Sequence, residues 1–380
     1  MFALQNSKPS LNSKERQPRS LSRRKRLVFS MITGALVVIT IGLAAEALTR
    51  LKGIEVLKLA ANFISISPPG RYFIKHPTRG YAYEPGEFTV TLGTGYSFRV
   101  SHQDDGLRRT HPAYEKTPPN KKEIWIFGCS FTHGFSLNDE QTYPWLLQHD
   151  VPDYEVVNFG VDGYGDVQSL IQFKESLKSR NKPAIVVVAY ASFHDTRNRA
   201  TRLWKKLLLT NSRLGPMNFP YATLGPDKEL VLLNDQLEYP GFALLRRSAL
   251  ANYLDNRYNI SIEESYHSHE VSRAVLKEFA NLCKANGIQF VVAGIMRDPL
   301  TAEMLAALNA EGVMTVDISV DLLLKENLNL PHDPHPSAIA NQQFASKLET
   351  FLSTKLIDNE RNTRWPGQTR VILSPAGNVR

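Results

Sequence analysis

A long apolar stretch lies near the start of the chain, where residues 27–45 contain no charged side chain. A run of this length, coiled as a helix, can cross the hydrocarbon core of a bilayer. The basic cluster Arg23–Arg26 directly precedes it, and positive charge flanking a membrane span is kept on the cytoplasmic side. We therefore expect an uncleaved signal-anchor helix over 27–47, with residues 1–26 in the cytoplasm.

The alternative for this segment is a cleaved signal peptide. The apolar core of a signal peptide is usually shorter than the run found here, and Ala44-Ala45-Glu46-Ala47 is a poor cleavage site. An uncleaved anchor would place the rest of the chain outside the cytoplasm. In a bacterium this predicts a single-pass inner-membrane protein whose folded part is periplasmic.

Between the apolar run and the middle of the chain, residues 48–119 show little helical periodicity. Phe88–Leu92 and Tyr96–Val100 instead alternate apolar and polar residues, with glycine between them. Alternation of this kind is typical of strands with one buried face, and glycine marks the turn. We expect a small β-rich segment here, and the Pro- and Lys-containing stretch 118–122 is a plausible boundary.

Residues 120–356 alternate between strand and helix patterns. Short apolar runs predict strands at 124–127, 154–159, 184–189, 288–295 and 313–318, and amphipathic periodicity predicts helices at 166–177, 270–286, 299–310 and 337–356. This order is typical of an α/β sandwich around one parallel sheet. Residues 200–268 interrupt the order and suggest a lid or a substrate-facing insertion, while the tail 357–380 has no clear period.

The net charge of +8 would suggest nucleic-acid binding if it were spread over the folded part. Residues 1–26, however, hold eight Lys or Arg against one acidic residue, which leaves about +1 for everything else. We therefore expect no nucleic-acid partner.

Two cysteines are present, Cys129 and Cys283. In an exported chain they could form a disulfide. Because Cys129 lies in a turn after a strand and Cys283 on the apolar face of a helix, we expect two buried thiols, although the spacing leaves a bridge open.

Candidate chemistry begins at Ser130, which follows the apolar strand 124–127 in a turn rich in small residues. Open α/β sheets bind their ligands at the carboxyl ends of the strands, where this hydroxyl is expected. A serine in such a turn can also serve only as the cap of the next helix. Asp333 and His335 stand two residues apart near the other end of the chain. Together the three predict a nucleophile, a base and a carboxylate that orients the base.

Four blocks in this order resemble the SGNH (GDSL-type) hydrolases: Gly-Cys-Ser-Phe-Thr-x-Gly at 128–134, Asn-Phe-Gly-Val-Asp-Gly-Tyr-Gly at 158–165, an apolar strand ending in a polar turn, and Asp-Pro-His-Pro-Ser at 333–337. The preceding Asp105–Arg108 is similar to a lead-in of membrane-anchored members related to polysaccharide O-acetyl esterases and transferases. The resemblance covers 120–356. It implies a flavodoxin-like three-layer sandwich and a catalytic triad of Ser130, Asp333 and His335.

The resemblance also implies an oxyanion hole made by the serine N–H, a glycine N–H of the second block and an asparagine of the third. Ser130 and Gly163 match the first two donors. The third block departs from the pattern, because His194-Asp195 stands where the family has Asn-Asp. We expect His194, or Asn198 four residues on, to be the third donor. His194 can equally be a hydrogen-bonded surface residue.

These observations predict a serine esterase that hydrolyses an O-acyl ester through an acyl-serine intermediate. Its substrate would be an acylated small molecule or polysaccharide, and acetyl is one candidate for the acyl group. No cofactor is expected, and no metal, because the histidines near 267–270 and 332–335 lack a metal-binding framework. One alternative is an O-acetyltransferase that uses the same triad on a sugar hydroxyl. Another is a binding or assembly protein with a decayed site.

Overall fold

The computed structural model describes residues 22–58, 64–115, 118, 120–211 and 214–357. The predictions for most of 1–26 and for the tail 357–380 therefore lie almost wholly outside the described residues. The chain divides into two compact units. One comprises residues 1–57 with 242–254, and the other comprises 58–241 with 255–380.

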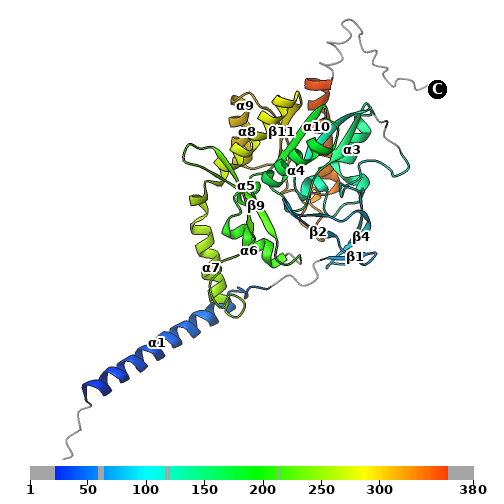
Figure 1. The fold of residues 1–380 in the computed structure, drawn as a ribbon. Helices are drawn as coiled ribbons and strands as arrows, with labels where there is room; N and C mark the ends of the chain where they lie inside the picture. Colours follow the sequence, from blue (N-terminus) through cyan, green and yellow to red (C-terminus); the bar gives the residue numbers. More distant parts are fainter. Residues whose placement is uncertain (1–21, 59–63, 116–117, 119, 212–213, 358–380) are drawn as a thin grey trace, which may run out of the picture. The chain divides into compact units, whose positions relative to one another are not determined.

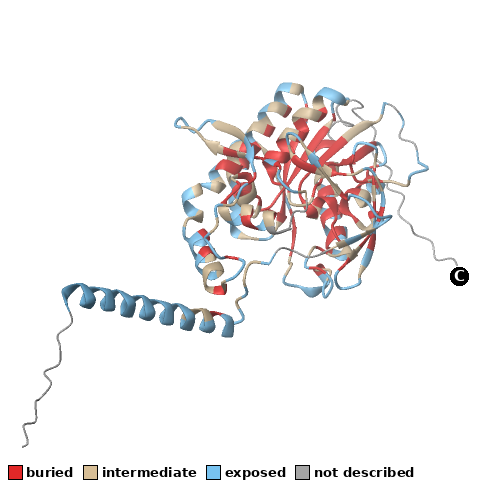
Figure 2. Cartoon of the chain, turned by 60° about the horizontal axis from the view of Figure 1, so that its bottom comes forward, coloured by how far each residue is buried: buried red, intermediate tan, exposed pale blue. Residues whose placement is uncertain are grey.

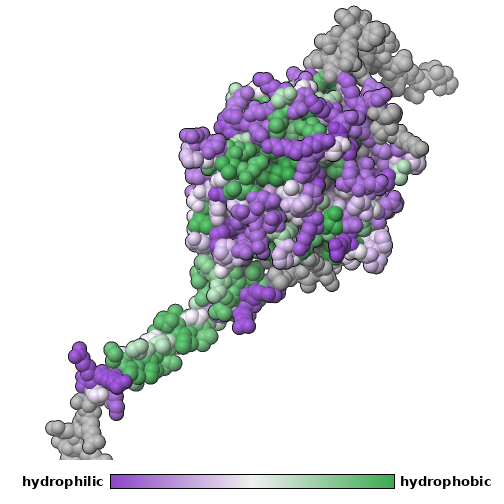
Figure 3. Space-filling view, viewed as in Figure 1, coloured by the Kyte–Doolittle hydropathy of each residue, from purple (hydrophilic) through white to green (hydrophobic). Residues whose placement is uncertain are grey.

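The first unit contains the predicted anchor as α1, Arg23–Leu51, which is long and apolar enough to cross a membrane. The helix begins before and ends after the expected span of 27–47, because helical backbone continues into the charged flanks. Its apolar side chains are exposed (Figure 2), and basic residues gather at its N-terminal end (Figure 3). Near its C-terminal end, the Glu46 carboxylate accepts hydrogen bonds from the Ser248 hydroxyl and from the N–H groups of Ala249 and Leu250. Glu46 therefore caps α7, Ala249–Ser261.

The second unit is built on a five-stranded parallel sheet in the order β12-β11-β8-β6-β7. Figure 1 shows the chain as a ribbon, with β11 of this sheet labelled. The strands are β6 Lys122–Phe127, β7 Tyr154–Asn158, β8 Ile185–Tyr190, β11 Gln289–Met296 and β12 Met314–Val320. Each lies within a few residues of an expected strand. The sheet thus has the predicted parallel α/β arrangement.

Helices cover both faces of this sheet, so that the second unit has three layers. Successive β6 residues point to opposite faces: Trp125 and Phe127 join one hydrophobic cluster, and Ile124 and Ile126 join the other. The first cluster contains residues of α4 Asp166–Ser179, α8 Ser268–Asn286 and α9 Pro299–Ala310. The second contains residues of α3 Tyr143–Asp150 and α10 Ala338–Leu352, which continues into a π-helical turn, Ser353–Ile357.

The β-rich segment forms a three-stranded antiparallel sheet and a hairpin. The sheet consists of β1 Ile64–Ser67, β4 Gly86–Leu92 and β5 Ser97–His102, and the hairpin of β2 Phe73–His76 and β3 Gly80–Tyr83. Alternating side chains of β4 are buried, as the apolar-polar pattern predicted. They share a third hydrophobic cluster with residues of the insertion.

The insertion predicted at 200–268 has regular structure of its own. It contains α6 Arg202–Asn211, an antiparallel hairpin of β9 Asn218–Leu224 and β10 Leu230–Gln236, α7, and a 3-10 turn at Glu263–Tyr266. Two short helices follow sheet strands: α2 Ser130–His133 after β6, and α5 His194–Asn198 after β8. Further 3-10 turns lie at Asp139–Gln141 and Lys325–Asn327.

Candidate active site

The turn after β6 carries Ser130 as the first residue of α2. This turn is tight, because α2 ends at Gly134 in the left-handed region with φ of 86°. A Cβ on Gly134 would lie 2.3 Å from Thr142 Cγ2, and one on Gly160 would lie 2.4 Å from the His133 nitrogen. Only glycine therefore allows the backbone to pass so closely at these positions. The turn presents the Ser130 side chain at the carboxyl edge of the sheet.

His335 lies within hydrogen-bonding distance of both other predicted triad residues. Ser130 Oγ is 3.0 Å from His335 Nε2, and His335 Nδ1 is 2.6 Å from Asp333 Oδ1. The His335 backbone N–H donates to the same carboxylate oxygen over 2.8 Å. Since the carboxylate accepts at Nδ1, the neutral ring carries its proton there and leaves Nε2 free to accept the serine proton.

Hydrogen bonds and aromatic contacts hold the loop that carries Asp333 and His335 in place. Asn329 N–H donates to the His335 carbonyl over 2.9 Å, and the Asn329 amide donates to the Ser136 carbonyl over 3.1 Å. The His335 ring packs against Phe135 and Phe131, with ring centroids 4.9 and 5.8 Å away. These contacts connect the loop directly to the nucleophile turn and orient the imidazole toward Ser130.

Gly163 lies in a loop fixed by two tyrosines of β3. The Tyr81 hydroxyl donates to the Asp162 carbonyl over 2.8 Å, and Asp162 N–H donates to the Tyr83 hydroxyl over 3.0 Å. Gly163 has φ of 77°, and a Cβ there would lie 2.6 Å from the Tyr81 hydroxyl oxygen. The β-rich segment thus shapes the loop that carries the expected second oxyanion donor.

Of the two expected third donors, Asn198 is engaged elsewhere. Both hydrogens of its amide are donated, to Asp166 Oδ2 over 2.7 Å and to Ser272 Oγ over 2.8 Å, so Asn198 has none left for an oxyanion. The fully buried His194 lies with its Nδ1 3.1 Å from Asp166 Oδ1, and its Nε2 has no hydrogen-bond partner in the described part of the chain. His194 is therefore a core residue and not a surface histidine. Its part in an oxyanion hole stays a prediction, as do those of Ser130 and Gly163.

Gly165 occupies the cap position of α4, and the Asp166 side chain turns inward to His194. Burial alone would lower the pKa of His194, yet Asp166 and the Cys129 thiol outweigh burial and raise it to about 9. Burial alone would raise the pKa of Cys129, and His194 reverses this and lowers it to about 6. Cys129, His194 and Asp166 thus form a buried polar cluster beside the nucleophile turn. Cys129 and Cys283 are both free and buried, without a bridge between them.

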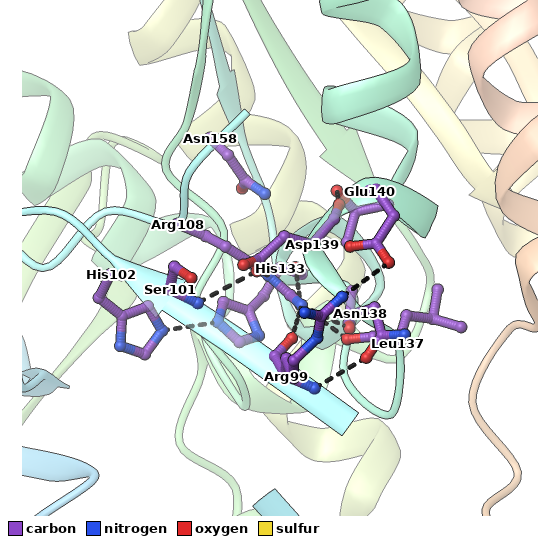
Figure 4. A network of polar contacts seen from close by, with 12 residues as sticks. Arg99, Ser101, His102, Arg108, His133, Leu137, Asn138, Asp139, Glu140 and Asn158 are labelled. Carbon is purple, nitrogen blue, oxygen red and sulfur yellow. Dashed lines mark hydrogen bonds and ion pairs between the residues drawn. The ribbon is translucent and has the colours of Figure 1, made fainter. Parts of the chain in front are cut away.

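A second buried network, which the sequence analysis missed, holds the residues after the nucleophile (Figure 4). Arg108 has no exposed surface and donates to Asp139 Oδ1 over 2.9 Å. It also donates to four backbone carbonyls, those of His133 (2.7 Å), Gly134 (2.6 Å), Leu137 (2.6 Å) and Arg99 (3.3 Å). The guanidinium therefore ties the end of α2 to the following loop and to β5. The only sequence signal for this role was an arginine within the 105–108 block.

His133 extends this network toward the Gly163 loop. Its Nε2 is 3.1 Å from His102 Nε2 (Figure 4). Its Nδ1 is 3.2 Å from Asp162 Oδ1. Burial lowers the pKa of both histidines, and Asp162 only partly offsets this effect at His133. Burial would raise the pKa of Asp162, but His133 and hydrogen bonds outweigh it and lower that pKa. The two buried histidines link the nucleophile turn to the loop of Gly163.

Comparison with known proteins finds no matching family model and no matching curated protein. Among solved structures, the chain is similar to TesA, with 14% identity over 61% of this chain and 99% of that one and a TM-score of 0.36. It is also similar to the psychrotrophic esterase EstA from Pseudoalteromonas sp. (11% identity, 62% and 99% covered, TM-score 0.36). A third similar structure is a family two carbohydrate esterase from Clostridium thermocellum (11%, 63% and 65%, TM-score 0.37).

Such distant similarity says nothing about chemistry, and the chain's own topology defines its fold. A parallel sheet lies between two helical layers, and Ser130 follows the strand β6 at its carboxyl edge. The loop before α10 brings Asp333 and His335 to that edge. The second unit therefore has a three-layer α/β fold around one parallel sheet, as the resemblance of its sequence blocks to the SGNH (GDSL-type) hydrolases led us to expect.

Proposed function

We propose that the protein is an SGNH-type serine esterase that hydrolyses an O-acyl ester through an acyl-serine intermediate. The observation that carries this proposal is the continuous hydrogen-bonded path from Ser130 Oγ through His335 to Asp333, with distances of 3.0 and 2.6 Å. A serine hydroxyl becomes an effective nucleophile at neutral pH only when such a base removes its proton during attack.

In the proposed reaction, Ser130 Oγ attacks the ester carbonyl carbon while its proton moves to His335 Nε2. The carbonyl electron pair shifts to oxygen, where the N–H groups of Ser130 and Gly163 would stabilise it. Collapse of this intermediate breaks the bond to the alcohol oxygen, which takes the proton from His335. Water then repeats the sequence on the acyl-serine and releases the acid. Asp333 keeps the imidazole oriented and stabilises its protonated form.

We further propose that α1 anchors the enzyme in the inner membrane with its N-terminus cytoplasmic and its catalytic unit periplasmic. The apolar surface of α1 and the basic residues at its start support this orientation. The substrate would then be an acylated small molecule or polysaccharide outside the cytoplasm.

One observation favours acyl transfer as a second candidate. Ser130 is only 7% exposed, and a nucleophile sheltered from water can hold an acyl group until another hydroxyl arrives. An O-acetyltransferase acting on a polysaccharide would use the same steps, with a sugar hydroxyl in place of water.

The test uses the full chain in detergent with a fluorophosphonate probe and p-nitrophenyl acetate. Wild type should be labelled and should turn over the ester, and Ser130→Ala should do neither. Ser179→Ala, an exposed serine on α4, is the matched control and should behave as wild type. If folded wild type shows neither labelling nor turnover, the esterase proposal fails and a non-catalytic binding protein takes its place. Faster acyl release on adding a polysaccharide would instead identify a transferase.

A further inference from the structure

A cavity of about 1060 Å³ borders the loop of Gly163. Its volume is at the upper end of the range that drug-sized ligands occupy and far exceeds what an acetyl group needs. None of the blocks that resemble the SGNH hydrolases predicted this cavity. Its walls come from residues 64–81 of the β-rich segment, from α6 and the residues after it, and from the loops carrying Phe135 and Gly163.

The lining is mainly aliphatic and aromatic. Its apolar members are Ile64, Ile66, Phe73, Ile74, Phe135, Leu207, Leu208, Leu214 and Met217. The charged members are Arg71 and Lys75, whose side chains are exposed, and Asp162. Because most of the lining is apolar, a hydrocarbon chain would displace water from it favourably.

The cavity borders the candidate active site. Gly163, whose N–H would face the carbonyl oxygen, lines it, and so does Phe135, whose ring centroid is 4.9 Å from that of His335. A substituent of a carbonyl held at Ser130 would enter the cavity past these two residues.

We propose that this cavity binds the acyl chain of the substrate, so that the enzyme prefers esters of medium or long fatty acids over acetyl esters. This inference rests on the proposed esterase function and names its substrate class. Each methylene that enters the cavity should raise kcat/KM about fourfold until the cavity is full. Beyond that length, kcat/KM should no longer rise with the length of the acyl chain.

The test compares p-nitrophenyl acetate, butyrate, octanoate and decanoate with the full chain in lipid nanodiscs. Leu207→Trp narrows the cavity at a side chain that is 49% exposed, so that folding should survive. It should lower kcat/KM for decanoate at least tenfold and for acetate less than twofold. Leu203→Trp, on the same helix, 40% exposed and outside the lining, is the matched control and should match wild type. Leu208→Ala should move the optimum to longer chains.

The proposal is overturned if wild type prefers acetate, or if Leu207→Trp lowers all four rates equally. A series of alkyl acetates, in which only the alcohol grows, is assayed alongside. The proposal is also overturned if kcat/KM depends on chain length only in that series, since the cavity would then hold the alcohol. Failure of the esterase function itself is recognised separately, by absent fluorophosphonate labelling of wild type. In that case a fluorescent fatty acid is titrated onto Ser130→Ala. Displacement by decanoate that Leu207→Trp weakens and Leu203→Trp does not would support an acyl-chain site, and no binding would overturn it.

Discussion

Replacing Arg108 with methionine should lower the free energy of unfolding by about 3–5 kcal/mol. The guanidinium is fully buried and donates five hydrogen bonds, one to the Asp139 carboxylate and four to backbone carbonyls. Methionine keeps much of the apolar volume but leaves the Asp139 charge and the carbonyls without this partner. Removing one member of a buried ion pair costs about 3–5 kcal/mol, because the remaining charge is left uncompensated.

Arg99 provides the matched control in the same network. Its side chain is 71% exposed, and its ion pair with the half-exposed Glu140 spans 3.3 Å (Figure 4). Exposed pairs of this kind contribute about 0–1 kcal/mol, because water screens them and both side chains lose freedom. Arg99→Met should therefore leave stability nearly unchanged, although both variants remove one positive charge.

Thermal unfolding of the full chain in detergent, followed by near-ultraviolet circular dichroism, measures the difference. Arg108→Met should lower the transition temperature by on the order of 10 °C, and Arg99→Met by no more than a few degrees. Arg108→Met should also reduce fluorophosphonate labelling below the transition, because the guanidinium positions the carbonyls that follow Ser130. Equal shifts in the two variants, or a loss below about 1 kcal/mol at Arg108, would refute the reasoning from burial.

Three further predictions concern the candidate site. Asp333→Asn should fold but lose about 10⁴-fold in kcat, because an amide no longer holds the imidazole tautomer that accepts the serine proton. Steady-state ester hydrolysis measures kcat, and a loss below tenfold would contradict the role of Asp333 in the triad. The Cys129 thiol has a pKa lowered to about 6 but no exposed surface. It should resist iodoacetamide in the native protein and react in denaturant, which mass spectrometry of tryptic peptides measures. Modification of the native protein would contradict its burial. Because burial lowers the pKa of His102 well below 6.5, the unfolded chain binds more protons between that lowered pKa and about 6.5. Stability should therefore fall as pH drops through this window. His102→Gln should weaken that dependence in urea titrations from about pH 7.5 to about pH 5, and an unchanged slope would assign the dependence to other groups.

Local patterns alone were enough to predict much of this protein. Residues close in the sequence determine whether a segment forms a membrane-length helix or a strand with alternating or continuous apolar residues. The positions of these elements could therefore be predicted from the sequence to within a few residues. The helix Pro299–Ala310 has the predicted bounds because its start and end signals are local: Asp298 accepts from the Thr301 N–H, and Gly312 follows its end. Asp333 and His335 were found for the same reason, since two residues of one loop must lie close together.

Contacts between distant parts of the chain decided the rest. Tertiary packing brings His133 against His102 and Asp162, and buries Arg108 among carbonyls that follow the nucleophile. It also turns His194 toward Asp166, the first residue of α4. The cavity beside Gly163 joins the β-rich segment to the insertion. The local periodicity of the sequence does not show which helices, strands and loops pack together, because burial and polar pairing depend on the packed chain as a whole. The sequence by itself therefore determined the order of elements and the candidate triad, and only the tertiary structure decided the buried networks and the shape of the site.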